Sequence, residues 1–253
     1  MEEKYAEFKS PGLTGIVVKT GSDCVFDPVS LIALPDDPDR CCKKGNTVQA
    51  GVNGTFFVKR FAYRTFWNSF RHLFKLSRPR HCLRAAEKLT ASGIDTPRVF
   101  GALRKFRNKL PLADYLITED ISSAAVFADK MPPGRQLLRE TCLLLARMHE
   151  AGIEHGDVSL RNLYQKNDGT WGVIDLDACR MYSLPLPHAR RRRELARLAS
   201  SFIKIRQIFP NSEKLPPDIA QLFAQEYQKI TRIDLNDFRY RKRVRYLAGR
   251  KRK

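Results

Sequence analysis

Two aspartates and an asparagine follow one another closely in the sequence HGDVSLRNLYQKNDGTWGVIDLD, residues 155–177. Asp157 and Asn162 flank a short loop-like stretch, and Asp175 follows the apolar run of residues 171–174. This pattern predicts a loop, a short hairpin and a strand end that bring three oxygen ligands together. Carboxylate and amide oxygens bind Mg²⁺, a hard cation, usually alongside substrate phosphates. A phosphoryl-transfer site needs such ligands and a carboxylate that orients the attacking hydroxyl.

The arrangement resembles the catalytic loop and metal-binding strand of the protein-kinase-like fold, which read H-R-D-x-x-x-x-N and D-F-G. His155, Asp157 and Asn162 match the loop, and Asp175 matches the metal-binding aspartate. The closer resemblance is to the lipopolysaccharide kinase family, whose strand ends in I-D-[FL]-D, like the sequence IDLD of residues 174–177. Either H-x-D or D-x-D alone is ordinary in a loop, and the combined Asp–Asn–Asp spacing after an apolar helix is what favours a functional site.

The resemblance implies ATP-dependent transfer of a phosphoryl group to a heptose or Kdo sugar of the lipopolysaccharide inner core. Asp157 would orient and deprotonate the sugar hydroxyl, as the catalytic residue. Asn162 and Asp175 would hold Mg²⁺. Asp177 is assigned as a further metal ligand, and an Asx-type turn that fixes the strand end is the alternative.

The same resemblance assigns four residues nearer the N-terminus to ATP. Asn53-Gly54 is a strong hairpin signal, and Lys59 lies on the strand that follows it. Lys59 would contact the ATP phosphates. The alternative is that it is an ordinary exposed strand lysine. Glu87, on the next expected helix, would hold Lys59 by an ion pair. Gly45 would belong to the turn over the phosphates, although that turn lacks the G-x-G-x-x-G pattern. Glu119 would lie in the hinge that meets adenine.

The fold expected is α+β, with the two lobes of a protein-kinase-like structure. A small β-sheet lobe would span residues 1–118, with short β-like runs that include residues 29–34. A larger helical lobe would span residues 119–253. It would contain a core helix over about residues 135–150, whose apolar residues recur at helical spacing just before the catalytic loop.

The stretch after Asp177 is short, because another amphipathic helix is expected from about His188. Protein kinases place there a longer segment that ends in A-P-E and docks a peptide, and this chain has none. Gly156 also stands where those enzymes have an arginine that pairs with a phosphorylated activation loop. Both features favour a small or sugar acceptor over a protein. The arginines of residues 190–193 begin the next helix and either meet anionic substrate groups or are solvated.

The chain has a formal net charge of +19 over 253 residues, a field that attracts nucleic acid, anionic membranes or phosphorylated substrates. Aromatic residues recur at helical spacing over residues 66–74 among several arginines. They predict a helix packed on the domain, an interfacial helix on anionic lipid, or a clamp for a phosphorylated sugar. The basic tail, residues 238–253, is expected to be mobile and solvated, with phospholipid, lipopolysaccharide phosphates or RNA as its possible ligands.

No apolar leader or membrane span is visible, which favours a cytoplasmic protein that is peripheral at the cytoplasmic face of the inner membrane. The expected partners are lipopolysaccharide or its lipid-linked core, as substrate, and the anionic membrane surface. Neither a nucleic acid nor an obligate protein partner is expected. The six cysteines are expected to be free thiols, with a zinc site from Cys41, Cys42, His81 and Cys82 as the alternative.

Three other functions remain open. A RIO-like kinase would explain the basicity through ribosomal RNA, but no N-terminal winged-helix segment is apparent. A pseudokinase that binds lipopolysaccharide or RNA by charge would have no need of the full set of Asp, Asn, Lys and Glu residues. A nucleic-acid-binding protein should interleave base-stacking aromatics with its basic tail, where only Phe238, Tyr240 and Tyr246 are available.

Overall fold

The computed structural model describes residues 3–20, 23–24, 26–33, 42–44, 47–52, 55–63, 65–73, 77–209, 213 and 215–249. The chain divides into two compact units. The first comprises Met1–Ala86 and Pro97–Ser123, and the second comprises Glu87–Thr96 and Ala124–Lys253. The sequence predicted two continuous lobes, residues 1–118 and 119–253. In the structure the units are discontinuous, because the segment Glu87–Thr96 belongs to the second unit.

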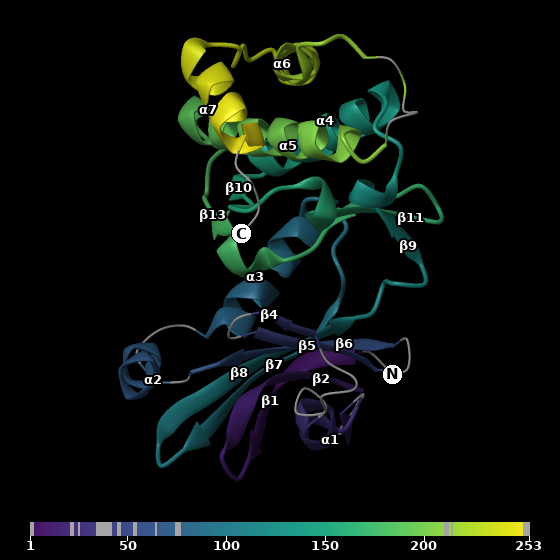
Figure 1. The fold of residues 1–253 in the computed structure, drawn as a ribbon. Coiled ribbons are helices and arrows are strands. Elements are labelled where there is room, and N and C mark those ends of the chain that lie inside the picture. Colours follow the sequence, from purple (N-terminus) through teal and green to yellow (C-terminus); the bar gives the residue numbers. More distant parts are fainter. Residues whose placement is uncertain are drawn as a thin grey trace. The chain divides into compact units, whose positions relative to one another are not determined.

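The first unit is built on an antiparallel sheet of eight strands (Figure 1). The strands are β1 (Glu3–Ser10), β2 (Leu13–Thr20), β3 (Asp23–Cys24), β4 (Cys42–Lys44), β5 (Thr47–Val52), β6 (Phe56–Ala62), β7 (Val99–Arg107) and β8 (Leu110–Glu119). Their order is β1-β2-β7-β8-β6-β5-β4, and β3 pairs with β2. The predicted hairpin is confirmed, since β5 pairs with β6, while its turn residues Asn53 and Gly54 lie outside the described residues.

A short helix, α1 (Pro28–Ala33), covers part of this sheet, so the β-like run predicted over residues 29–34 was wrong. The local sequence explains the helix. The Asp27 carboxylate accepts hydrogen bonds from the backbone N–H groups of Val29 (3.0 Å) and Ser30 (3.3 Å), which is N-capping, and proline is favoured at the first helical position. Leu31 and Ile32 are buried, and their packing outweighs the β propensity of the run.

The core of the first unit lies where α1 meets the sheet. Its buried members are Leu13, Val17, Leu31, Ile32, Val58, Leu103, Ala113, Tyr115 and Ile117. One fully buried charge, Asp114, is stabilised elsewhere in the sheet by Arg104, whose Nε donates to Oδ1 at 2.7 Å. The Tyr63 hydroxyl donates to Oδ2 of the same carboxylate at 2.6 Å, so the buried charge is well satisfied.

Two helices, α2 (Phe66–Leu73) and α3 (Arg78–Ala91), follow β6. The spacing of the aromatic residues predicted the first, and the second is the expected helix that carries Glu87. α3 ends at Ala91, and Gly93, two residues later, has a φ of +67°, the left-handed conformation that glycine adopts readily after a helix. The next residues are bonded to the rest of the second unit through Asp95, whose carboxylate accepts from Tyr164 Oη (2.5 Å) and Lys166 Nζ (3.0 Å). Thr96 Oγ1 donates to the carbonyl of Val173 at 2.9 Å. These bonds explain why Glu87–Thr96 belongs to the later unit.

The second unit is rich in helices that pack on one another and on two small sheets (Figure 1). The helices are α4 (Arg135–Glu150), α5 (His188–Arg206), α6 (Ile219–Thr231) and α7 (Phe238–Gly249). The strands are β9 (Ala125–Phe127), β10 (Ile153–Glu154), β11 (Leu163–Lys166), β12 (Trp171–Val173) and β13 (Arg180–Met181). β11 lies between β12 and β9, and β10 pairs with β13. The core helix predicted over residues 135–150 is confirmed as α4.

The mobile tail predicted over residues 238–253 was wrong for most of its length, because α7 packs against α5. Tyr240 and Val244 form a narrow apolar stripe at i and i+4, and both are buried. The Tyr240 hydroxyl donates to the carbonyl of Ala220 at 2.9 Å. The Asp237 carboxylate accepts from the backbone N–H of Tyr240 (2.8 Å) and pairs with Arg192 (2.8 Å). The many charged residues of the segment predicted a mobile tail, because the few residues that anchor it to the protein are hard to recognise among them.

Three cysteines whose surroundings are described, Cys82, Cys142 and Cys179, are buried free thiols, as expected. Cys41, one of the alternative zinc ligands, lies outside the described residues. Across the described ranges, no three His, Cys, Asp or Glu side chains gather so as to hold a metal ion by themselves. Within the same ranges, no helix has the length and apolarity that would let it cross a bilayer.

The packing of α7 can be tested with two tyrosines of the same helix. Tyr240 is 0% exposed, and Tyr240→Ala should lower the free energy of unfolding by about 3 kcal/mol, since it empties a buried aromatic site. Tyr246 is 63% exposed, and Tyr246→Ala should change the same quantity by less than about 0.5 kcal/mol. Urea denaturation measures both values. Equal stability of the two variants would mean that the C-terminal segment is not part of the packed structure.

Candidate active site

The loop that follows β10 is fixed by the buried ring of His155. Its Nε2 contacts the carbonyl of Ile174 at 2.9 Å, and its Nδ1 accepts from the backbone N–H of Asp157 at 3.4 Å. A neutral imidazole with its proton on Nε2 satisfies both contacts. The ring therefore joins the loop to the strand end that carries Asp175, while the Asp157 side chain is left exposed to solvent.

Asn162 makes a second connection between the same two segments. Its Nδ2 donates to the carbonyl of Asp157 at 2.9 Å, and its own carbonyl accepts from the backbone N–H of Ile174 at 2.9 Å. Because the amide nitrogen is used in this way, Oδ1 is the side-chain atom left for a cation. The second unit thus links Asp157, Asn162 and the residue before Asp175 in one hydrogen-bonded network.

Asp175 has a left-handed backbone, with φ 64° and ψ 58°, directly after β12 and Ile174. Aspartate tolerates this conformation better than most residues, but it is uncommon outside turns and suits a functional position. A short 3₁₀ turn, Leu176–Ala178, follows. Leu176 and Cys179 are buried and anchor the turn, and burial raises the pKa of the Cys179 thiol. Asp177 lies in this turn and is half-buried.

Gly156 has a physical reason to be glycine. Its φ is +83°, and a Cβ at this position would lie 2.3 Å from the carbonyl oxygen of Ala178, far inside contact distance. The catalytic loop and the turn after Asp175 therefore touch backbone to backbone at Gly156. A side chain, including the arginine of protein kinases, does not fit there.

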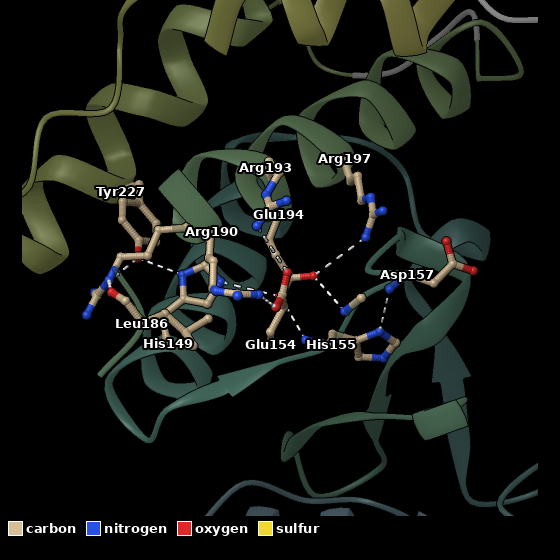
Figure 2. A network of polar contacts seen from close by, with 12 residues as sticks. His149, Glu154, His155, Asp157, Leu186, Arg190, Arg193, Glu194, Arg197 and Tyr227 are labelled. Carbon is tan, nitrogen blue, oxygen red and sulfur yellow. Dashed lines mark hydrogen bonds and ion pairs between the residues drawn. The ribbon is translucent and has the colours of Figure 1, made fainter. Parts of the chain in front are cut away.

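A buried carboxylate from α5 holds the loop from behind (Figure 2). Glu194 is 0% exposed. Its Oε2 accepts from the backbone N–H of His155 at 2.8 Å, and its Oε1 accepts from that of Gly156 at 2.8 Å. These are the two residues directly before Asp157, so Glu194 sets the position of the candidate catalytic loop, residues 155–162.

Burial alone would favour a neutral Glu194, but the pKa of this carboxyl is lowered because His149, His155 and the backbone N–H of His155 stabilise the anion. His149 Nε2 lies 3.5 Å from Glu194 Oε2, and His149 Nδ1 lies 2.7 Å from the Tyr227 hydroxyl. Burial lowers the pKa of His149, although Glu194 opposes the shift. His149 is thus a buried hydrogen-bonding residue, and the network runs from α6 through α4 and α5 to the loop.

Glu154, at the end of β10, is a second carboxylate near the start of the loop. Its Oε2 accepts from Arg190 Nη1 (2.5 Å) and from the Tyr182 hydroxyl (3.2 Å). Arg191, at 3% exposure, is also part of the structure, since its Nε donates to the carbonyl of Leu186 at 2.6 Å. The arginines of residues 190–193 were expected either to meet anionic substrate groups or to be solvated. Neither expectation holds for Arg190 and Arg191, because both side chains make contacts within the protein.

The chain is similar in sequence to known proteins. The sequence model of the lipopolysaccharide kinase (Kdo/WaaP) family matches residues 43–232. The chain belongs to this family. Two 3-deoxy-D-manno-octulosonic acid kinases of Stenotrophomonas maltophilia, from strains K279a and R551-3, are each 31% identical over 45% of this chain and 53% of their own length. The chain thus spans about half the length of the curated relatives it matches.

The fold of this lipopolysaccharide kinase family member matches a solved structure, WaaP in complex with acyl carrier protein. The TM-score is 0.59 at 19% identity, over 87% of this chain and 92% of the other. The α+β, kinase-like fold predicted from the sequence is therefore confirmed, as is the predicted family.

The residues assigned to ATP are distributed over both units of this family member. Lys59 is buried in β6 of the first unit, with Nζ 5.2 Å from the centroid of the Phe61 ring. Glu87 is exposed on α3, at the start of the second unit. Glu119 ends β8, and its backbone N–H already donates to the carbonyl of Arg98 at 2.8 Å. Gly45 lies outside the described residues. Their roles toward ATP stay predictions.

The donor set fits Mg²⁺ through Asn162 Oδ1 and the Asp175 carboxylate, which are hard oxygen ligands. Two such ligands from the protein are typical of a Mg²⁺ ion whose coordination is completed by nucleotide phosphates and water. Asp177, two residues further on, offers another carboxylate on the same turn. The metal roles of these three residues stay predictions.

Sequence reasoning missed Glu194, although a signal was present. In the run RRRELARLASSF, Glu194 falls on the helical stripe that also carries Leu198 and Phe202, which points into the core. An acid on a buried stripe must be satisfied by buried donors. The sequence does not say which donors those are, because they are backbone groups about forty residues earlier in the chain.

Proposed function

We propose that this chain transfers a phosphoryl group from ATP to a hydroxyl of a lipopolysaccharide inner-core sugar. The observation that carries the proposal is the hydrogen-bonded network that joins Asp157, Asn162 and the strand end at Asp175, in a member of the lipopolysaccharide kinase family. Such an arrangement supplies the carboxylate and the metal ligands that phosphoryl transfer requires.

Asp157 is the candidate catalytic base, because its carboxylate is exposed while its backbone is held on both sides. It would accept the proton of the sugar hydroxyl and orient the oxygen toward the phosphorus. Asn162 and Asp175 would hold Mg²⁺, which supplies charge neutralisation of the phosphates when bound. Lys59 would bind ATP phosphates, with Glu87 as its ion-pair partner.

Between the two candidate sugars, we favour Kdo over heptose as the acceptor. Both curated relatives are named as kinases of 3-deoxy-D-manno-octulosonic acid, the full name of Kdo. Transfer to a heptose would overturn this choice and leave the reaction class intact. The RIO-like alternative would instead give phosphorylated protein.

The reaction can be tested by incubation of the protein with ATP, Mg²⁺ and dephosphorylated lipopolysaccharide core, followed by mass spectrometry of the glycan. Asp157→Asn and Asp175→Asn should each reduce transfer by at least about a hundredfold, because they remove the base and a metal ligand. Asp168→Asn is the matched control, since Asp168 lies in the exposed turn between β11 and β12 and should leave the rate unchanged. Full turnover by a folded Asp157→Asn variant would refute the mechanism.

The helix α2 supports a further part of the proposal, binding to the anionic surface of the inner membrane from its cytoplasmic side. Phe66 is 62% exposed, Trp67 is 71% exposed and Phe70 is 43% exposed, although large aromatics are normally buried. The Phe66 ring lies beside both others, with its centroid 6.0 Å from that of Trp67 and 6.3 Å from that of Phe70. Arg71 is exposed beside them. An aromatic face with basic neighbours fits a helix that lies at the headgroup level of anionic lipid.

Cosedimentation with vesicles tests this surface. The wild type should bind vesicles that contain phosphatidylglycerol and should bind pure phosphatidylcholine vesicles weakly, because the net charge adds electrostatic attraction. The double variant Phe66→Ser/Trp67→Ser should lose at least about tenfold in affinity for the anionic vesicles. Ile208→Ser removes a side chain that is 66% exposed on the second unit and should have no effect. Equal binding by the aromatic variant and this control would rule out α2 as the membrane contact.

A further inference from the structure

Three arginines of the second unit converge where α5 packs against α7. Arg193 and Arg197 lie one turn apart on α5, and Arg243 comes from α7. Burial lowers the pKa of the Arg243 guanidinium, and the positive charges of Arg197 and Arg193 lower it further. These three like charges are called here the arginine cluster.

The arginine cluster is poorly neutralised by the protein. Its neighbours Arg190 and Arg192 have close carboxylate partners, Glu154 at 2.5 Å and Asp237 at 2.8 Å. In contrast, Arg193 Nη2 is 3.9 Å from Glu154 Oε1, and Arg197 Nη1 is 3.9 Å from Glu194 Oε1. Both carboxylates are already engaged, by Arg190 and by the backbone of the catalytic loop.

Arg243 is the least satisfied member of the cluster. Its Nε is buried, and among the residues that the structure describes it has no hydrogen-bond partner. A guanidinium group presents five N–H donors in a planar fork that matches carboxylate and phosphate oxygens. An oxyanion bound beside the partly exposed Arg193 and Arg197 would offset the repulsion between the three charges and would accept hydrogen bonds from these guanidinium groups.

The cluster adjoins the catalytic loop. Arg197 Nη1 lies 3.9 Å from the Glu194 carboxylate, and that carboxylate accepts the backbone N–H of Gly156, the residue before Asp157. Arg193 approaches Glu154, at the strand end from which the loop starts. Figure 2 shows both arginines reaching from α5 to the carboxylates beside this loop. A group bound by the cluster would therefore be held near the base that receives the acceptor hydroxyl.

We propose that Arg193, Arg197 and Arg243 bind an anionic group of the acceptor, either a phosphate monoester or a sugar carboxylate. This inference rests on the proposed function for the identity of the acceptor, while the anion site itself does not require catalysis. The cluster positions the glycan, so that the hydroxyl to be phosphorylated is presented to Asp157.

Thermal unfolding with anionic probes tests the site without any transfer reaction. Inorganic phosphate or free Kdo, compared with chloride at equal ionic strength, should raise the Tm of the wild type, because a ligand that binds only the folded state stabilises it. The double variant Arg193→Gln/Arg243→Gln should lose this rise. The probe with the larger effect identifies the phosphate or the carboxylate as the recognised group.

A matched control lies on α7 itself. Lys242→Gln/Arg245→Gln removes the same charge from two exposed residues of that helix, so its phosphate-induced rise in Tm should equal that of the wild type. An equal rise in the Arg193→Gln/Arg243→Gln variant would overturn the site, because the anion would then bind elsewhere. Absence of any rise in the wild type would overturn it as well.

Kinetics then connect the site to the acceptor. In Arg193→Gln/Arg243→Gln, the KM for the lipopolysaccharide acceptor should rise about tenfold, while the KM for ATP and kcat stay within about twofold. An unchanged acceptor KM would contradict the assignment to the acceptor. Failure of the wild type to transfer phosphate at all would contradict the proposed function, and the Tm measurement would still decide whether the anion site exists.

Discussion

The buried carboxylate of Glu194 is the interaction on which the candidate site depends. Removal of an ionised group from water costs several kcal/mol, and here two backbone N–H groups of the catalytic loop and the ring of His149 offset that cost. The carboxylate and the loop depend on each other. The carboxylate is stable only if the loop is in place, and the loop has its observed position because the carboxylate accepts its N–H groups. A long helix can thereby fix an irregular loop to which it contributes no backbone hydrogen bonds.

The same constraint explains the form of the loop. With its backbone held by Glu194 and the ring of His155 bound to Ile174, the loop passes so close to Ala178 that Gly156 has no room for a Cβ. The exposed carboxylate of Asp157 is then presented by a rigid support, which is what a group that must orient a hydroxyl requires. Among the arginines of α5, Arg190 neutralises Glu154, while Arg193 and Arg197 belong to the proposed anion site.

Much of this could be predicted from the sequence, and the reason differs between elements. The helix α4 and the β5–β6 hairpin follow from local periodicity and from Asn53-Gly54, so short-range patterns were sufficient. Catalytic candidates could be found because their spacing is itself the motif. The helix α1 was missed because a cap at Asp27 outweighed β propensity, and α7 because two buried residues are hidden among many charges. Glu194 was missed because its partners are distant backbone groups.

Amide hydrogen exchange in Glu194→Gln is the most direct test of the central claim, that this carboxylate holds the catalytic loop. A charge-assisted hydrogen bond contributes about 1.5–3 kcal/mol, so the amides of His155 and Gly156 should exchange at least about tenfold faster than in the wild type. The amides of the β11–β12 hairpin, in the same unit, should keep their rates, and kcat should fall as the loop loosens. Unchanged exchange at His155 and Gly156 in the folded variant would contradict the claim, since the loop would then be held by other contacts.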